Sequence, residues 1–200
     1  MKFNAIRGIV ARFPQVPKLC PKILGSLVLC TSIQATVAAT YWVSPLGSDA
    51  NNGTSSNTPF ATPQKAVKLP ALAAGDTIYV RGGTYALSAK VSPDKAGTAA
   101  NYINFWAYPG ERPVFDFATM TTTSKGLDLR MDYWHTKGIE VQNNTTESGI
   151  FISGIGQIVE GCVVHDCNND GFILGSTGVK ATNTLILNCD SYRNFQPSSA

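Results

Sequence analysis

Residues 158–168, IVEGCVVHDCN, can be laid over residues 185–195, LILNCDSYRNF, so that Cys162 falls on Cys189. Gly149-Ile-Phe-Ile precedes the first stretch, and the similar Gly171-Phe-Ile-Leu precedes the second. The spacing between these two segments is slightly shorter than the spacing between Cys162 and Cys189. Short apolar strands that repeat roughly every 20 to 30 residues are typical of a solenoid, in which each repeat forms one coil. Asn, Gly and Asp turns join the strands of such a fold. The repeat therefore predicts an all-β fold, a parallel β-helix (β-solenoid).

Strand patterns continue toward the N-terminus. In DTIYVRGGTY (residues 76–85), Ile78 and Val80 alternate with Tyr79 and Arg81. The same alternation follows in residues 101–117, and further short strands are predicted near 133–141 and from residue 149 onward. Such alternation indicates strands with one face in the core and one face toward solvent.

One short helix is expected at the start. Thr62 can cap it with its hydroxyl, and Pro63 suits the first helical position. Ala66, Val67 and Leu69 give a single apolar face before Pro70 ends the segment. Because the first coil of a solenoid would otherwise expose apolar strands, we expect this helix to cap it.

Equivalent residues of successive coils should stack in columns, about 4.8 Å apart. The overlays place Ile150 over Phe172 and Cys162 over Cys189. Leu185 and Leu187 are expected to point inward with Cys189, against only one neighbouring coil. Asparagines near the turns are expected to satisfy backbone groups where the chain bends; they are Asn143, Asn168, Asn169, Asn188 and Asn194.

The charge distribution separates the start of the chain from the rest. Five of the 16 basic residues lie in the first 22 positions, and no acidic residue occurs among them. The remaining chain has 11 basic and 13 acidic residues, so its charge is about −2. This balance gives no electrostatic support for a nucleic-acid partner.

The basic residues at the N-terminus indicate a secretion signal. It leads into the apolar run ILGSLVLCTSI (residues 23–33), which is shorter than the roughly 20 residues that a membrane span needs. Val37 and Ala39 suit the −3 and −1 positions of signal peptidase. We therefore expect a signal peptide over 1–39, a mature chain from Thr40, an extracellular or periplasmic location and no membrane attachment after cleavage. A lipoprotein signal ending at Cys30 is the alternative, although Leu29 is bulky where a small residue is preferred.

Cleavage would leave three cysteines, Cys162, Cys167 and Cys189. They form no CxxC pair and lack a nearby histidine cluster, so a zinc site is not expected. Core packing of free thiols is the favoured interpretation, and a Cys162–Cys189 disulfide stays open as an alternative.

Several segments resemble a known family. The opening of the mature region is similar to the N-terminal cap and first coil of many secreted right-handed parallel β-helix proteins. More specific segments, in the same order, resemble polysaccharide lyase family nine, the pectate lyase L type; they are RPVFDF (112–117), DYWHTKGIEV (132–141) and NCDSYRNFQP (188–197). The resemblance covers roughly residues 40–197. It implies a right-handed β-helix of about ten coils that cleaves polygalacturonate, an acidic plant-type polysaccharide, by β-elimination.

The family chemistry implies a calcium ion held by aspartates and a lysine that acts as base. Those aspartates lie in DGF-like turns that follow the SYRN segment, and this sequence ends seven residues after Arg193. The resemblance therefore implies a β-helix domain over 40–200 that is incomplete at its C-terminal end. Calcium is expected for the full-length parent, and no catalytic or metal-binding residue and no bound cofactor is predicted within this chain.

Four residues remain as candidates for part of a substrate groove: Asp166, Asp170, Asp190 and Arg193. Asp170-Gly171-Phe172 looks like a DGF turn, but Asp before Gly is also among the commonest turn pairs.

Other titratable side chains have weaker claims to a role. Lys137 and Lys180 are candidate bases by residue type only and are expected to be solvated. His135 lacks the partners of a catalytic histidine, and His165, which overlays Tyr192, is expected at the surface.

Two hypotheses follow. The chain is the N-terminal part of a secreted, calcium-dependent pectate lyase and is itself inactive, or it is a non-catalytic β-helix module that binds glycan or serves as a surface spacer. An uncovered last coil would also be expected to promote association between copies.

Overall fold

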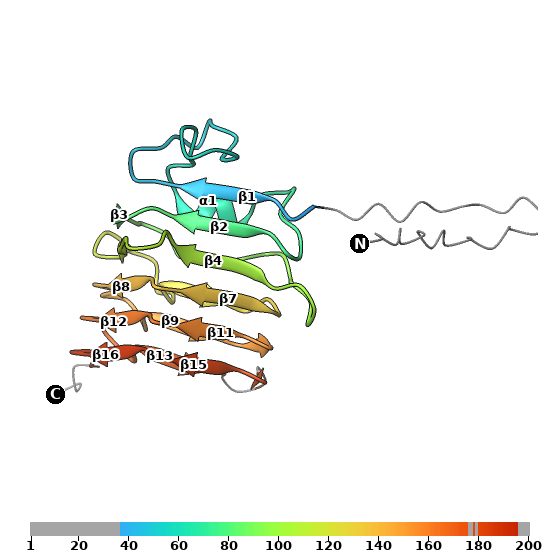
Figure 1. The fold of residues 1–200 in the computed structure, drawn as a ribbon. Coiled ribbons are helices and arrows are strands. Elements are labelled where there is room, and N and C mark those ends of the chain that lie inside the picture. The colour runs from blue at the N-terminus through green and yellow to red at the C-terminus, as the bar shows by residue number, and fades with distance from the viewer. Residues whose placement is uncertain (1–36, 176–177, 179, 196–200) are drawn as a thin grey trace, which may run out of the picture. The chain divides into compact units, whose positions relative to one another are not determined.

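The strands of the chain stack coil upon coil, as Figure 1 shows. The computed structural model describes residues 37–175, 178 and 180–195, so most of the predicted signal peptide, residues 1–36, lies outside the described residues. Successive coils add strands to the sheets that form the sides of the solenoid.

The largest sheet has six strands, and successive coils supply them in chain order. These strands are β1 (Thr40–Val43), β2 (Thr77–Val80), β4 (Ile103–Ala107), β7 (Trp134–Lys137), β11 (Ile158–Glu160) and β15 (Leu185–Leu187).

A second sheet has five strands, β3 (Gly83–Ala86), β5 (Pro113–Asp116), β8 (Glu140–Gln142), β12 (Val163–His165) and β16 (Asp190–Tyr192). A third has three strands, β6 (Leu127–Leu129), β9 (Ile150–Ile152) and β13 (Phe172–Leu174). A two-stranded sheet joins β10 (Gly154–Ile155) to β14 (Ala181–Thr182).

Every strand pair between coils is parallel. The core lies between the sheets, where alternate residues of each strand point inward. One inward column runs through Ile78, Phe105, Thr136 and Val159, all fully buried. This confirms the predicted parallel β-helix, and it shows that Ile78 and Val80 form the inward face of β2.

The register confirms the two overlays that predicted the coils. Ile150 pairs with Phe172, and the backbone N–H of Cys162 lies 3.4 Å from the sulfur of Cys189 on the next coil. All three cysteines after residue 40 are free thiols in the structure. The pKa of Cys162 is raised by its contact with Cys189 and by burial, so this thiol stays protonated.

The two spacings found in the sequence have a structural cause. Ile152 pairs with Leu174, and Gly154, two residues after Ile152, pairs with Ala181, seven residues after Leu174. The five extra residues of the later coil therefore enter between β13 and β14, and the register on either side of them is kept.

The expected orientation of Leu185 and Leu187 is wrong. They pair with Ile158 and Glu160, while Ile186 pairs with the fully buried Val159. Ile186 therefore points into the core, and the two leucines face outward with 46% and 38% of their surface exposed.

The start of the solenoid is covered mainly by a loop. Phe60 forms a parallel bridge with Val43, and its backbone N–H donates to the carbonyl of Trp42 at 2.8 Å. Helix α1 (Pro63–Val67) is a single short turn with Thr62 as its N-cap, as predicted, and it buries Ala66 and Val67 in the core. The loop drawn above β1 in Figure 1 thus closes the edge, and α1 fills the space beneath it.

Asparagines shape several turns. Asn143 and Asn188 adopt positive φ angles of 56° and 50°, a conformation that asparagine tolerates well. The side chain of Asn194 accepts from the N–H of Cys167 and donates to the carbonyl of Val164, both at 3.0 Å. These contacts confirm structural roles for three of the predicted asparagines.

Candidate functional site

The outer face of the three-stranded sheet carries a cluster of charged side chains. In β6, Leu127 and Leu129 point into the core, and Asp128 between them points outward. Asp128 pairs with Phe151 of β9, so Phe151 lies on the same outer face.

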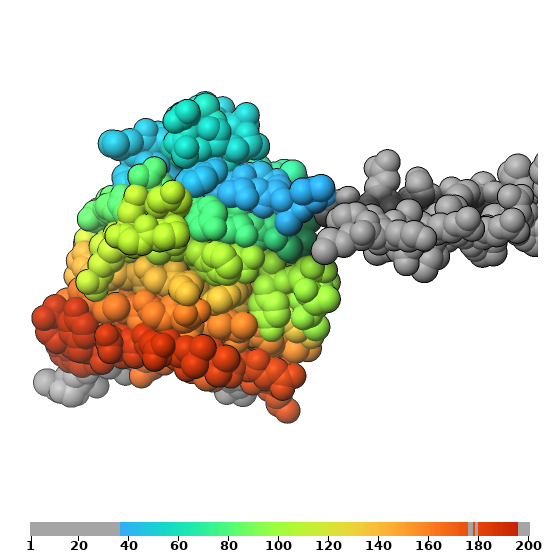
Figure 2. Space-filling view, in the orientation of Figure 1, coloured from blue at the N-terminus to red at the C-terminus, as the bar shows by residue number. Residues whose placement is uncertain are grey.

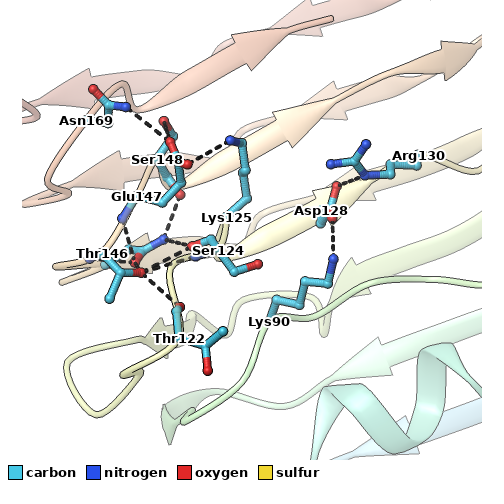
Figure 3. Close-up of polar contacts among 11 residues, drawn as sticks. Lys90, Thr122, Ser124, Lys125, Asp128, Arg130, Thr146, Glu147, Ser148 and Asn169 are labelled. Carbon is cyan, nitrogen blue, oxygen red and sulfur yellow. Dashed lines mark hydrogen bonds and ion pairs between the residues drawn. The ribbon is translucent and has the colours of Figure 1, made fainter. Parts of the chain in front are cut away.

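Asp128 holds two cations in place on this face (Figure 3). One carboxylate oxygen accepts from Nζ of Lys90 at 2.8 Å, and the other accepts from Nε of Arg130 at 2.7 Å. The Asp128 side chain is only 1% exposed, whereas those of Lys90 and Arg130 are 43% and 40% exposed. A buried carboxylate therefore orients two positive groups that remain accessible to solvent.

Phe151 forms the apolar floor of the cluster. It is 1% exposed although it points outward, because charged side chains cover its ring. The guanidinium carbon of Arg130 lies 4.5 Å from the ring centroid, and Nζ of Lys125 lies 5.8 Å from it. Cation–π contacts of this kind help to fix the positions of both cations.

Lys125 is held from its other side by Glu147. Their ion pair spans 3.0 Å, and Asn169 also donates to Glu147 at 3.1 Å. Partial burial raises the pKa of Glu147, but the hydrogen bonds from Lys125 and Asn169 outweigh this effect, and the pKa lies below its ordinary value. Glu147 is therefore ionised at neutral pH.

Asn144 fixes the loop that carries Glu147. It is fully buried, and its amide group donates to the carbonyls of Ser124 and Ser148 at 2.9 and 2.8 Å. Its side-chain oxygen accepts from Thr146. Figure 3 shows how these contacts join the turns of two neighbouring coils beside the cations.

We name Lys90, Lys125 and Arg130 the cation cluster. Its three positive charges form ion pairs with only two carboxylates, those of Asp128 and Glu147. Arg130 uses Nε for Asp128, and within the described residues its terminal amino groups donate no hydrogen bond. The cation cluster can therefore bind a further carboxylate, which suits a ligand that carries negative charges along its length.

Two of the four predicted groove residues are in contact. Arg193 binds Asp166 through two hydrogen bonds, of 2.7 and 2.5 Å. Arg193 and His165 together hold the pKa of Asp166 well below its ordinary value. A shallow pocket beside the pair is lined by Thr145, Asn168 and Phe195 as well.

The expectation that His165 lies at the surface is wrong. The residue is 6% exposed, and its ring nitrogens lie 3.0 Å from Glu140 and 2.6 Å from Asp166. Pairing with two carboxylates from the same sheet and the adjoining turn explains why a histidine is buried here.

The other predicted groove residues lie apart from this pair. Asp170 is exposed at the entry to β13, where its backbone carbonyl accepts from Gly149. Asp190 is exposed at the start of β16 in the five-stranded sheet. The four candidates thus belong to two different sides of the coil.

The aspartates present do not fit a calcium site. Asp166 is engaged by Arg193 and His165, while Asp170 lies at the entry to β13 and Asp190 at the start of β16. Across residues 37–175, 178 and 180–195, no group of three or more His, Cys, Asp or Glu side chains is placed to hold a metal ion. No catalytic step through calcium is derived for this part of the chain.

The two lysines singled out by residue type face solvent, as expected. Lys137 lies on the outer side of β7 and pairs with Glu160 at 2.8 Å, and Lys180 is exposed. Neither lies in the cation cluster.

The cation cluster was missed in the sequence, although a signal for it exists. Gly126-Leu-Asp-Leu occupies the same place in its coil as Gly149-Ile-Phe-Ile and Gly171-Phe-Ile-Leu. An aspartate at the outward position of that repeat, where the next two coils have Phe151 and Ile173, marks the site.

Comparisons with known proteins agree with this fold. Residues 41–200 match the family model described as "Pel9A-like, right handed beta helix region". Pectate lyase L of Paenibacillus polymyxa (strain SC2) is 34% identical over 141 residues, which are 66% of this chain and 31% of that protein. Pectate lyase L of Dickeya chrysanthemi is 32% identical over 168 residues, which are 78% of this chain and 38% of that protein.

A solved structure supports the same assignment. The crystal structure of pectate lyase Pel9A superposes with a TM-score of 0.68 at 27% sequence identity, over 81% of this chain and 41% of that one. The chain thus spans about a third of the length of the two curated relatives, which are 31% and 38% covered.

Proposed function

Because the chain belongs to the Pel9A-like right-handed β-helix family, we propose that it supplies polygalacturonate-binding coils of a pectate lyase. In this proposal the substrate lies along the outer face of the three-stranded sheet and contacts the cation cluster. The lyase activity of the whole protein is part of the proposal, since the curated relatives carry that name and the matched region is only 31% and 38% of their length.

One observation carries the proposal. A buried aspartate, Asp128, presents Lys90 and Arg130 to solvent on the same outer face as Lys125. Polygalacturonate has one carboxylate on each sugar, so a stretched chain can place carboxylates against cations on neighbouring coils. Fixed cations lose less conformational freedom on binding than mobile ones, which favours a specific site over general attraction.

Catalysis needs groups beyond the cation cluster. β-Elimination requires a base for the proton on C5 and a cation that neutralises the neighbouring carboxylate. The described aspartates do not form a site for such a metal ion, so binding is the role we propose for these coils. A non-catalytic module that binds glycan is the second candidate, and the separation of Asp166, Asp170 and Asp190 favours it for this chain taken alone.

Affinity electrophoresis in gels that contain polygalacturonate tests the binding role. The wild-type chain should be retarded, and Arg130→Gln and Lys90→Gln should each weaken binding about five- to tenfold, within the range for the net contribution of one hydrogen bond. Lys68→Gln is the matched control, because it removes the same charge from an exposed position beside α1. Gels with fully methyl-esterified pectin, which lacks the charges, should retard none of the proteins strongly.

Two results would overturn the proposal. The first is an absence of retardation of the wild-type chain by polygalacturonate. The second is an equal loss in Lys68→Gln and Arg130→Gln, which would indicate attraction by net charge without a site.

Secretion is also proposed. It is supported by the basic and apolar composition of residues 1–39 and by a polysaccharide substrate that occurs outside cells. Within residues 37–175, 178 and 180–195, no helix has the length and apolar character required to cross a membrane.

A further inference from the structure

A group of aromatic side chains lies on a different side of the solenoid. Trp42 of β1, Tyr79 of β2 and Trp106 of β4 are in register on three successive coils. They alternate with the buried residues of these strands and therefore point outward from the six-stranded sheet. Tyr108 follows two residues after Trp106, and we name these four residues the aromatic patch.

The rings of the aromatic patch touch one another. Trp42 lies 5.3 Å from both Tyr79 and Tyr108, measured between ring centroids, and Tyr79 lies 5.7 Å from Tyr108. Trp106 extends the patch, with its ring centroid 6.3 Å from that of Tyr79. Contacts of this size restrict the rings, and each of the four residues keeps part of its surface exposed.

The patch is not part of the core. All four residues are only partly buried, in contrast to Trp134, which is fully buried on the inner side of the same sheet. The six-stranded sheet faces the viewer in Figures 1 and 2, and in the described part of the chain no helix crosses it on this side. Helix α1 packs against the core with Ala66 and Val67.

Charges at the rim of the patch are balanced. Arg81 lies over Tyr108, at 5.0 Å from its centroid, but its guanidinium is bound by Glu111 at 2.7 to 2.9 Å. Lys137, next in the column after Trp106, pairs with Glu160 at 2.8 Å. Because each rim carries one cation paired with one carboxylate, the patch offers a polyuronate no net positive charge, and it does not disfavour an uncharged polymer.

We propose that the aromatic patch binds an uncharged polysaccharide by stacking against its sugar rings. Pyranose rings with equatorial substituents have flat C–H faces, and Trp and Tyr offer rigid apolar area for such faces at low entropic cost. Hydroxyl groups of the polymer can bond to the polar rim formed by Arg81, Glu111 and Lys137. The patch would hold a neutral wall glycan while the cation cluster, on another sheet, holds the acidic one.

This site is separate from the one in the proposed function. The cation cluster lies on the three-stranded sheet, and the aromatic patch lies on the six-stranded sheet. Arg130→Gln should therefore leave binding of a neutral polymer unchanged, and Tyr79→Ala should leave binding of polygalacturonate unchanged.

Affinity electrophoresis with hydroxyethylcellulose, a soluble neutral β-glucan, tests the proposal. The wild-type chain should be retarded, and Tyr79→Ala and Trp106→Ala should each lose at least about fivefold in affinity, within the range for loss of a stacked aromatic contact. Tyr79→Phe keeps the ring and should retain binding. Tyr102→Ala is the matched control, because Tyr102 is a partly buried tyrosine that contacts Tyr133 and lies outside the patch.

Tryptophan fluorescence gives a second readout. The chain has three tryptophans, and Trp134 is fully buried, so acrylamide quenching reports mainly Trp42 and Trp106. Hydroxyethylcellulose should reduce this quenching in the wild-type chain. Circular dichroism of each variant checks that the fold is kept.

The proposal is wrong if the wild-type chain is not retarded and its quenching is unchanged. It is also wrong if folded Tyr79→Ala and Trp106→Ala proteins bind as the wild type does. If the wild type dimerises, these variants are monomeric and none of them binds the glucan, the patch is an interface between copies and the proposal fails.

Discussion

The imidazole of His165 lies flat on the phenol ring of Tyr192, with 4.8 Å between the ring centroids and 4° between their planes. The two residues occupy equivalent positions on neighbouring coils. Glu140 and Asp166 contact the two ring nitrogens of the histidine, so one buried ring joins three coils.

We expect His165→Ala to lower the free energy of unfolding by about 1–3 kcal/mol, because two carboxylates lose a hydrogen-bond partner. Tyr192→Phe keeps the stacked ring and should change it by less than about 0.5 kcal/mol. Urea unfolding followed by circular dichroism measures both. Equal stability of the wild type and His165→Ala would show that the stack and its carboxylates contribute nothing.

The ion pair of Asp166 predicts a dependence of stability on pH. Arg193 and His165 hold the pKa of this carboxyl below its ordinary value of 3.8, so its contribution is complete above that value and is lost as the pH falls below it. The melting temperature of the wild type should therefore fall below about pH 4, and that of Asp166→Asn should fall less.

Asp94→Asn is the control for this comparison, because Asp94 is 50% exposed and contacts only its neighbour Lys95, at 3.5 Å, among the ion pairs of the described residues. Its pH profile should run parallel to that of the wild type. A parallel profile for Asp166→Asn as well would contradict the prediction.

Asp128→Asn separates positioning from net charge at the cation cluster. The change removes a negative charge, so general electrostatics predicts tighter binding of polygalacturonate. Because Asp128 orients Lys90 and Arg130, we expect instead that affinity falls about five- to tenfold. Affinity electrophoresis decides between the two directions, and Asp94→Asn again controls for charge.

The 200-residue chain should show no calcium-dependent lyase activity. Among the described residues, Asp166, Asp170 and Asp190 form no group placed to hold a metal ion, and Asp166 is already bound by Arg193. The measurement is the absorbance of unsaturated uronate products from polygalacturonate, with pectate lyase L of Paenibacillus polymyxa assayed in parallel. A signal that a chelator abolishes would show that these aspartates take part in a calcium site and would contradict the prediction.

Exported protein should begin at Thr40, the first residue of β1. Cleavage there removes Ala39, whose backbone N–H donates to the buried Asp76 at 2.7 Å, and leaves every strand of the solenoid intact. Mass spectrometry of protein from the culture medium or periplasm identifies the first residue. Soluble cytoplasmic protein with an intact Met1 would rule out the signal peptide.

The stacking of the coils could be predicted because it depends on local repeats. Cys162 over Cys189 and Ile150 over Phe172 follow from spacing alone. The side to which Leu185 and Leu187 point could not be predicted in this way, because three apolar residues in a row have no alternation.

The repeat could have marked the place of the cation cluster through Asp128, but the ion pairs themselves were beyond local patterns. Lys90 and Asp128 are 38 residues apart, and His165 and Glu140 are 25 residues apart. These pairs form only when the length of every turn between them brings their coils together. Sequence spacing predicts columns within strands, but it does not predict which loop residue reaches across to a neighbouring coil.

The five extra residues between β13 and β14 indicate where such a fold can change its loops. Elsewhere, one added residue within a strand would exchange its inward and outward faces. Between β13 and β14 the chain has five extra residues, while Leu174 and Ala181 keep their partners on the preceding coil. This segment is therefore a natural place to graft a peptide, such as an affinity tag or a second binding loop, because the strands on either side keep their register.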